Sequence, residues 1–128
     1  MKSRAISTVA LVAALIACGH ERSADPSALP TQDDALLAVT NDHWLDMNIF
    51  AVRGGTRQRL GTVPGFKKDT IPLRLTVLSG GTPVRLLAEP IGLQERHLSD
   101  AIQVGPGEVV DFRIRSPLNL SSVMVSRR

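Results

Sequence analysis

Residues 108–115 read EVVDFRIR, and this stretch decides the fold class. Val110, Phe112 and Ile114 alternate with polar or charged neighbours over most of its length. An alternation with a period of two is typical of a β-strand that buries one of its two faces. We therefore predict a strand here, with Phe112 in the core.

Short apolar runs of the same kind continue on both sides, and clusters of Gly, Pro, Asn and Asp divide them. No convincing helical stretch of ten or more residues is present. Regularly spaced short strands with turn signals between them are typical of an all-β domain. We predict an antiparallel β-sandwich of seven or eight short strands, with a small β-barrel as the alternative. The predicted strands are 35–41, 45–53, 57–63, 69–77, 83–89, 97–104, 108–115 and 119–126.

Three local features predict where individual strands lie in the sheets. Residues 49–52 are apolar on both faces, so strand 45–53 is expected to be central. Pro72 has no backbone N–H to donate, which places strand 69–77 at an edge. Gly61, inside strand 57–63, indicates a bulge.

The composition limits the classes of protein that remain. The chain has 128 residues, of which 43% are hydrophobic and one is cysteine, with a net charge of +3. One cysteine excludes a disulfide-stapled mini-protein and a cysteine-based zinc module. The apolar content excludes a disordered polyelectrolyte. One small domain remains, together with targeting and linker sequence.

The first residues have the pattern of a secretory signal. Lys2 and Arg4 precede an apolar run that is too short to span a bilayer as a mature helix. The run ends in Leu15-Ile16-Ala17-Cys18, which resembles the lipobox of bacterial lipoproteins. That resemblance implies that the Cys18 thiol is lipidated and that the chain is cut before it. The alternative is an ordinary signal followed by a buried core cysteine.

The resemblance divides the chain into a signal peptide (1–17), a lipidated cysteine with a disordered tether (18–34) and a domain (35–128). The tether is rich in Ser, Pro and Asp and holds almost nothing apolar to bury. In lipoproteins of two-membrane bacteria, an Asp after the cysteine retains the protein in the inner membrane. Gly19 therefore implies the outer membrane if the host has two membranes.

The domain itself is similar in style to small, uncharacterised β-sandwich lipoproteins of environmental bacteria. The similar stretches are residues 48–63, with their Arg-Gly-Gly-Thr turn, and residues 86–92, which read LLAEPIG. This resemblance covers about half of the domain and implies no known activity.

Arginines form the first candidate site. Arg57 and Arg59 share one face of their predicted strand, and Arg113 and Arg115 share one face of theirs. If these strands are neighbours in one sheet, the four guanidinium groups form a face for an anionic partner. The alternative is a set of solvated strand faces that prevent edge aggregation.

The loop after strand 35–41 forms the second candidate site. Asp42, His43 and Asp46 offer carboxylate and imidazole ligands for a metal ion, although the signal is weak without a fourth ligand. The alternative is a turn in which Asx side chains bond their own backbone. Trp44 is either a core residue or an exposed anchor for a partner, and we expect it to be partly buried.

Catalysis is not expected. Glu95, His97 and Asp100 could form an acid–base group with His43, but no nucleophile motif or phosphate-binding loop accompanies them. We predict no cofactor. Nucleic acid and carbohydrate partners are also not expected, because one Trp, three Phe and no Tyr provide little stacking surface.

Taken together, these features predict a lipid-anchored binding or assembly module of the cell envelope, periplasmic or at the surface. The membrane is contacted through Cys18, and the most favoured partner is another envelope protein. The alternative is a lipoprotein that binds a small ligand or a metal ion through the Asp42–Asp46 loop.

Overall fold

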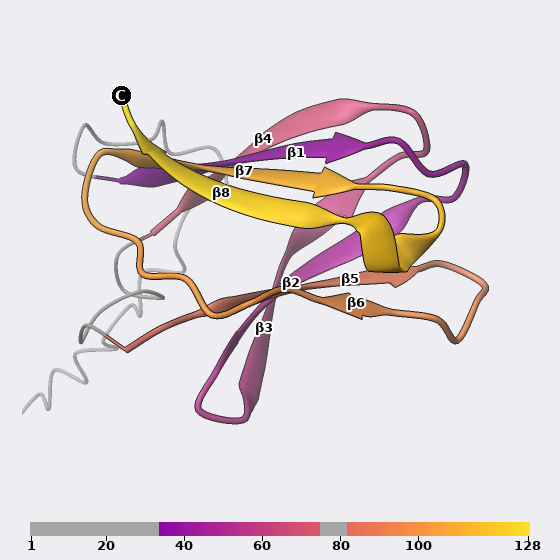
Figure 1. Ribbon diagram of the computed structural model, residues 1–128, viewed down its shortest axis with the longest axis horizontal. Coiled ribbons are helices and arrows are strands. Elements are labelled where there is room, and N and C mark those ends of the chain that lie inside the picture. Colours follow the sequence, from indigo (N-terminus) through magenta and orange to yellow (C-terminus); the bar gives the residue numbers. More distant parts are fainter. Residues whose placement is uncertain (1–33, 75–81) are drawn as a thin grey trace, which may run out of the picture.

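A computed structural model describes residues 34–74 and 82–128. These residues form eight strands in two four-stranded sheets that pack face to face (Figure 1). The sheets do not close into a barrel, so the predicted β-sandwich is confirmed. The elements are β1 (Ala35–Asn41), β2 (Met47–Arg53), β3 (Thr56–Val63), β4 (Lys68–Leu73), β5 (Arg85–Pro90), β6 (His97–Leu98), β7 (Glu108–Ile114), the 3₁₀ helix η1 (Leu118–Leu120) and β8 (Ser122–Arg127).

The strand order is β4-β1-β7-β8 in one sheet and β3-β2-β5-β6 in the other. All pairs are antiparallel except β1 and β7, which run parallel. The predicted antiparallel sandwich is confirmed, with this one parallel pair as a departure from it. Alternation reports which face of a strand is buried and carries no information about the direction of its neighbour.

The core lies between the sheets and consists of alternate residues from both. Phe112 is 1% exposed at its centre, as the alternation in residues 108–115 predicts. Its neighbours in the core are aliphatic, and include Leu37, Met47, Ile49 and Leu86. Burial of these side chains provides most of the driving force for folding, because the hydrophobic effect is proportional to the apolar area removed from water.

The local predictions about strand position are confirmed. Strand β2 lies between β3 and β5, and β4, which contains Pro72, is an edge strand. The register of β2 with β3 shifts between Ile49 and Phe50, which leaves Leu60 as the extra residue beside Gly61. A bulge at this position bends β3 and increases its twist.

Phe50 shows how an apolar residue is buried on the outer face of the sandwich. It is buried, as a core residue would be, but it belongs to the outer face of its sheet and not to the core between the sheets. The guanidinium carbon of Arg57 lies 4.6 Å from the centre of its ring and covers it. An apolar residue on an outer face can thus be buried by a long side chain of the next strand.

Two predicted strands are shorter than expected. In the stretch 97–104 only His97–Leu98 forms a strand, and Ile102 makes an isolated bridge with Val84. The ladder is interrupted at Ser99, whose hydroxyl accepts the Leu86 N–H at 2.9 Å. The stretch 119–126 begins with η1, and β8 starts only at Ser122. The end of the predicted strand 69–77 lies outside the described residues.

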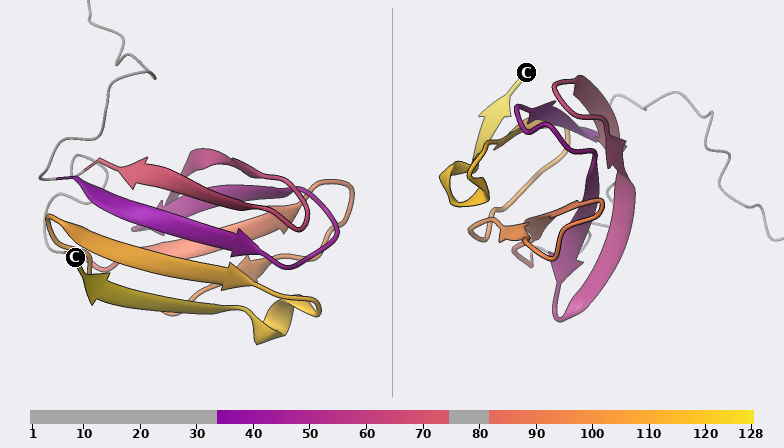
Figure 2. Two further views of the ribbon diagram at one scale, coloured as in Figure 1. Left: turned by 90° about the horizontal axis from the view of Figure 1, so that it is seen from above. Right: turned by 90° about the vertical axis from the view of Figure 1, so that its right-hand side faces the viewer.

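The direction of β1 defines two ends of the sandwich. β1 begins at Ala35 and carries the chain to Asn41 at the opposite end of the sandwich (Figure 2). We call that opposite end the distal end; it holds the β1–β2, β3–β4 and β5–β6 loops and the β7–β8 connection with η1 (Figure 1). Among the described residues, none forms a helix with the length and apolar character needed to cross a membrane.

Candidate functional site

The distal end exposes large apolar side chains in all four of its connections. Trp44 is 61% exposed and Phe66 is 71% exposed. Three aliphatic side chains in the other two connections are also exposed: Ile91, Leu93 and Leu120. Four strands about 4.8 Å apart and two sheets about 10 Å apart make this end only about 15 by 10 Å across the backbone. One partner could therefore contact all four connections at once.

The β1–β2 loop is fixed by the buried side chain of Asn41. Its Nδ2 group donates to the carbonyl oxygens of Leu45 at 2.8 Å, Val63 at 3.1 Å and Pro64 at 3.1 Å. Its Oδ1 accepts the His43 N–H at 3.0 Å and closes an Asx turn. A single buried amide therefore joins the β1–β2 loop to the β3–β4 loop.

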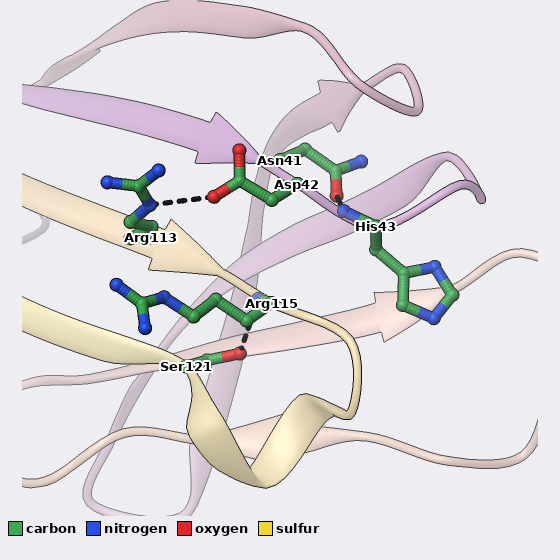
Figure 3. A network of polar contacts seen from close by, with 6 residues as sticks. All are labelled: Asn41, Asp42, His43, Arg113, Arg115 and Ser121. Carbon is green, nitrogen blue, oxygen red and sulfur yellow. Dashed lines mark hydrogen bonds and ion pairs between the residues drawn. The ribbon is translucent and has the colours of Figure 1, made fainter.

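The predicted metal ligands have other partners. Asp42 Oδ2 accepts from Arg113 Nε at 2.6 Å (Figure 3). His43 Nδ1 accepts the Leu45 N–H at 3.0 Å. Asp46 Oδ1 accepts the Gly65 N–H at 3.0 Å. Within residues 34–74 and 82–128, no group of three such side chains is arranged to hold a metal ion. These three weak candidates are therefore not arranged as a metal site, and the Asx turn considered beside it is present.

The backbone carbonyl groups of Asp46 and His43 also position the neighbouring loops. The Asp46 carbonyl accepts the Ile91 N–H at 2.9 Å, and the His43 carbonyl accepts the Phe66 N–H at 3.0 Å. The β1–β2 loop is thus hydrogen-bonded to the loops on both sides of it. The polar residues that suggested a metal site from the sequence hold the exposed apolar side chains in place.

Trp44 and Phe66 are presented by a restrained backbone. The ring of Trp44 stacks on the buried ring of His43, with 5.7 Å between the centres. Phe66 has a φ of 57°, in the left-handed region that a bulky residue rarely adopts. A Cβ added at Gly65 would lie 2.3 Å from the Trp44 carbonyl oxygen, so only glycine fits between these residues. Trp44 is exposed, so the expectation that it is partly buried is wrong.

The four arginines do not form one face. Arg57 and Arg59 are on β3, and Arg113 and Arg115 are on or directly after β7, in the other sheet. The two pairs therefore lie on opposite outer faces of the sandwich, and the predicted common face is wrong. The spacing of two residues correctly predicted that the members of each pair lie on one side of their strand. The order of the strands, in contrast, is a property of the whole fold.

Each arginine pair has its own surroundings. Arg57 bonds Glu89 at 2.8 Å, and Arg59 bonds Asn48 at 3.0 Å across the outer face of β2. Arg113 lies at the distal end through its ion pair with Asp42 (Figure 3). The Arg115 N–H donates to Ser121 Oγ at 3.0 Å and holds the connection that carries η1.

The suggested acid–base residues are distributed over separate places. His97 and Asp100 line a shallow hollow of about 290 Å³ between β6 and β8, whereas Glu95 lines a different hollow. Burial against Phe112 lowers the pKa of His97, and Asp100 partly opposes that shift. His43 belongs to the β1–β2 loop and lines neither hollow. The geometry provides no acid–base group of four residues.

Sequence reasoning missed most of the exposed apolar residues of the distal end. Phe66, Ile91 and Leu93 follow the turn signals Pro64-Gly65 and Pro90 and stand outside the predicted strands, whereas Leu120 was included in the predicted strand 119–126. An apolar residue inside a turn segment has no strand face on which to be buried. A large apolar residue within a turn segment was therefore the feature of the sequence that could have revealed this exposed surface.

No protein-family model and no curated protein matches this sequence. Among solved structures, the chain is similar to a protein from Eubacterium rectale whose structure was determined by NMR. The sequence identity is 11% and the TM-score is 0.47, over 79% of this chain and 96% of that chain. A likeness of this size carries no argument, so the fold assignment rests on the two sheets described above.

Proposed function

We propose that this protein is a lipid-anchored module of the cell envelope that binds another envelope protein through its distal end. The exposed pair Trp44 and Phe66 is the observation that supports this function. Aromatic side chains of this kind are frequent energetic anchors of protein interfaces, because they bury a large area with few rotatable bonds. The lipobox at Cys18 supports the anchor.

The position of the site agrees with an anchor at the start of the domain. The tether leads into Ala35, and the distal end lies at the other end of β1. A domain anchored in this way can direct Trp44 and Phe66 away from its own membrane. The outer membrane is the proposed membrane if the host has two.

The basic residues near the aromatic pair indicate the chemistry of the partner. Lys67 and Lys68 follow Phe66 and are exposed, and Arg113 and Arg115 lie at the same end of β7, which β1 separates from β4. A partner surface with an apolar centre and carboxylates at its rim fits this arrangement. Rim charges of this kind raise the association rate and contribute to specificity more than to affinity.

The distal end is tested by cross-linking a C-terminally tagged, lipidated copy in cells and identifying the captured proteins by mass spectrometry. We expect one dominant protein at near-equal amounts. The double substitution Trp44→Ala with Phe66→Ala should reduce its capture at least tenfold, since each lost hot spot costs about 2 kcal/mol or more. Equal capture by this variant would refute the proposed surface.

Leu98→Ala is the matched control, because Leu98 is an exposed apolar residue of β6 outside the distal loops. It should leave capture unchanged. The anchor is tested separately by Cys18→Ala, which should release the protein from the membrane fraction because acyl chains at the cysteine provide the membrane affinity. Full retention of Cys18→Ala in the membrane pellet would show that the lipobox interpretation is wrong.

A further inference from the structure

The edges of the two sheets differ in how they are protected from pairing with another strand. β4 carries Pro72 and a charged start, β3 carries a bulge with Arg57 and Arg59, and β6 has only two residues. Proline, charges, bulges and short length are the usual protections of an edge strand. Of the described edge strands, β8 is the least protected, because residues 122–126 are uncharged and its one charge is Arg127, the last residue of the strand.

The backbone of β8 offers hydrogen-bonding groups to the outside. The Ile114 carbonyl accepts the Asp42 N–H on the β1 side of β7, so alternate residues of β7 direct their backbone groups toward β8. The register pairs those residues with 122, 124 and 126 of β8. The N–H and C=O groups of Val123 and Val125 therefore point away from β7, at the free edge.

The sequence of this edge is the same in both directions. Residues 122–126 read Ser-Val-Met-Val-Ser, a palindrome centred on Met124. Antiparallel pairing of two such strands about Met124 places identical residue types opposite one another. We propose that β8 pairs antiparallel with β8 of a second copy of this chain, with the two-fold axis at Met124.

This register fits the geometry of the edge. Val123 of each copy faces Val125 of the other, and the outward N–H and C=O groups of both residues bond across the axis. Met124 forms a non-hydrogen-bonded pair with its own copy, where side chains approach most closely. Arg127 faces Ser121 of the other copy, so no like charges lie directly opposite each other.

The pairing also covers apolar surface that one copy leaves exposed. Met124 is 67% exposed and Val125 is 37% exposed. A contact of about five residues per copy is smaller than the standard interface, so we expect an association too weak to survive dilution. The pairing is therefore best measured by covalent trapping.

The test introduces cysteines into the full-length, membrane-associated protein and oxidises it. Met124→Cys should form a disulfide-linked dimer, because the two residues face each other at about 4.5 Å between Cα atoms. Ser126→Cys is the matched control on the same face, since its copies would lie about 13 Å apart along the strands. We expect about tenfold more dimer from Met124→Cys. The unchanged chain, with Cys18 only, measures any dimer that forms without the edge.

A second pair of variants tests the register. Copies with Ser122→Cys should cross-link to differently tagged copies with Ser126→Cys, and neither should cross-link to itself. Adding Met124→Glu to both copies should lower this heterodimer about tenfold, because two carboxylates would face each other on the axis. Adding Met124→Gln should change it by less than about twofold.

Three outcomes would overturn the proposal. One is equal cross-linking of Met124→Cys and Ser126→Cys, which is the result of random collision. Another is the absence of dimer from every variant while the thermal unfolding curves match that of the unchanged chain. The third is a mixed disulfide of Met124→Cys with a different protein, which would assign the edge to a strand of that protein.

Discussion

The distal end and the β8 edge both expose apolar side chains, but their backbones differ. At the distal end, Asn41 and Asp46 occupy the backbone groups of the loops with hydrogen bonds, so Trp44 and Phe66 are held in fixed positions. At the β8 edge, the outward backbone groups of Val123 and Val125 face no strand of this chain within the described residues. A surface with an occupied backbone binds through its side chains, whereas an open edge also binds through its backbone.

The largest expected effect comes from a core substitution that destabilises the whole fold, and with it both the distal end and the β8 edge. Phe112→Ala should lower the free energy of unfolding by about 3–5 kcal/mol, because it removes a fully buried ring from the centre of the core. Chemical denaturation monitored by circular dichroism measures this loss. Phe50→Ala is the control, and should cost at least about 1 kcal/mol less, since water can fill the space on an outer face. An unfolding curve unchanged by Phe112→Ala would contradict the strand assignment of residues 108–115.

The next change breaks the distal end and spares the β8 edge. Asn41→Ala leaves buried backbone groups of Leu45 and Val63 without their partner and should cost about 3 kcal/mol. Hydrogen exchange should increase in the β1–β2 and β3–β4 loops and stay unchanged in β8. Asn48→Ala is the control, and should cost less than about 1 kcal/mol, because Asn48 bonds an exposed arginine. Equal costs for the two variants would show that Asn41 does not fix these loops.

A smaller effect is expected from the ion pair of the distal end, and it separates the contribution of charge to stability there from that of the backbone hydrogen bonds. Arg113→Gln removes the exposed ion pair with Asp42 and should cost about 0.2–1 kcal/mol. The loss should decrease at 1 M salt, where charges are screened within about 3 Å. Thermal unfolding at low and high salt measures it. A cost that does not depend on salt would show that Arg113 acts through packing instead of charge.

The smallest effect concerns His97 of β6, which lines the hollow between β6 and β8. Burial lowers the pKa of His97 in the folded protein below its ordinary value of 6.5. The unfolded chain therefore binds a proton more readily, and stability should fall as the pH drops through 6.5 toward the lower folded value. His97→Gln should lose less stability over the same pH range. Denaturation measured between pH 7.5 and pH 5 tests this, and identical pH profiles would exclude His97 as the source.

The sequence was most informative where the physical cause is local. Alternation with a period of two predicted the strands and the burial of Phe112, and the missing N–H of Pro72 predicted an edge strand. The apolar stretch 49–52 predicted the central position of β2. In each case the residues that carry the signal are within a few positions of one another, and the backbone geometry of a strand acts at that range.

The tertiary structure alone decided which residues meet. It separated Arg57 from Arg113, because strand order depends on the packing of the whole chain and not on the spacing within a strand. It gave Asp42 and Asp46 partners from distant segments, the Arg113 guanidinium and the Gly65 N–H, whereas His43 accepts from Leu45 in its own loop. It also gathered Trp44, Phe66, Ile91, Leu93 and Leu120 at one end, because strand direction determines which loops are neighbours. The candidate site is therefore a property of the assembled sandwich, whereas the strands that build it are encoded locally.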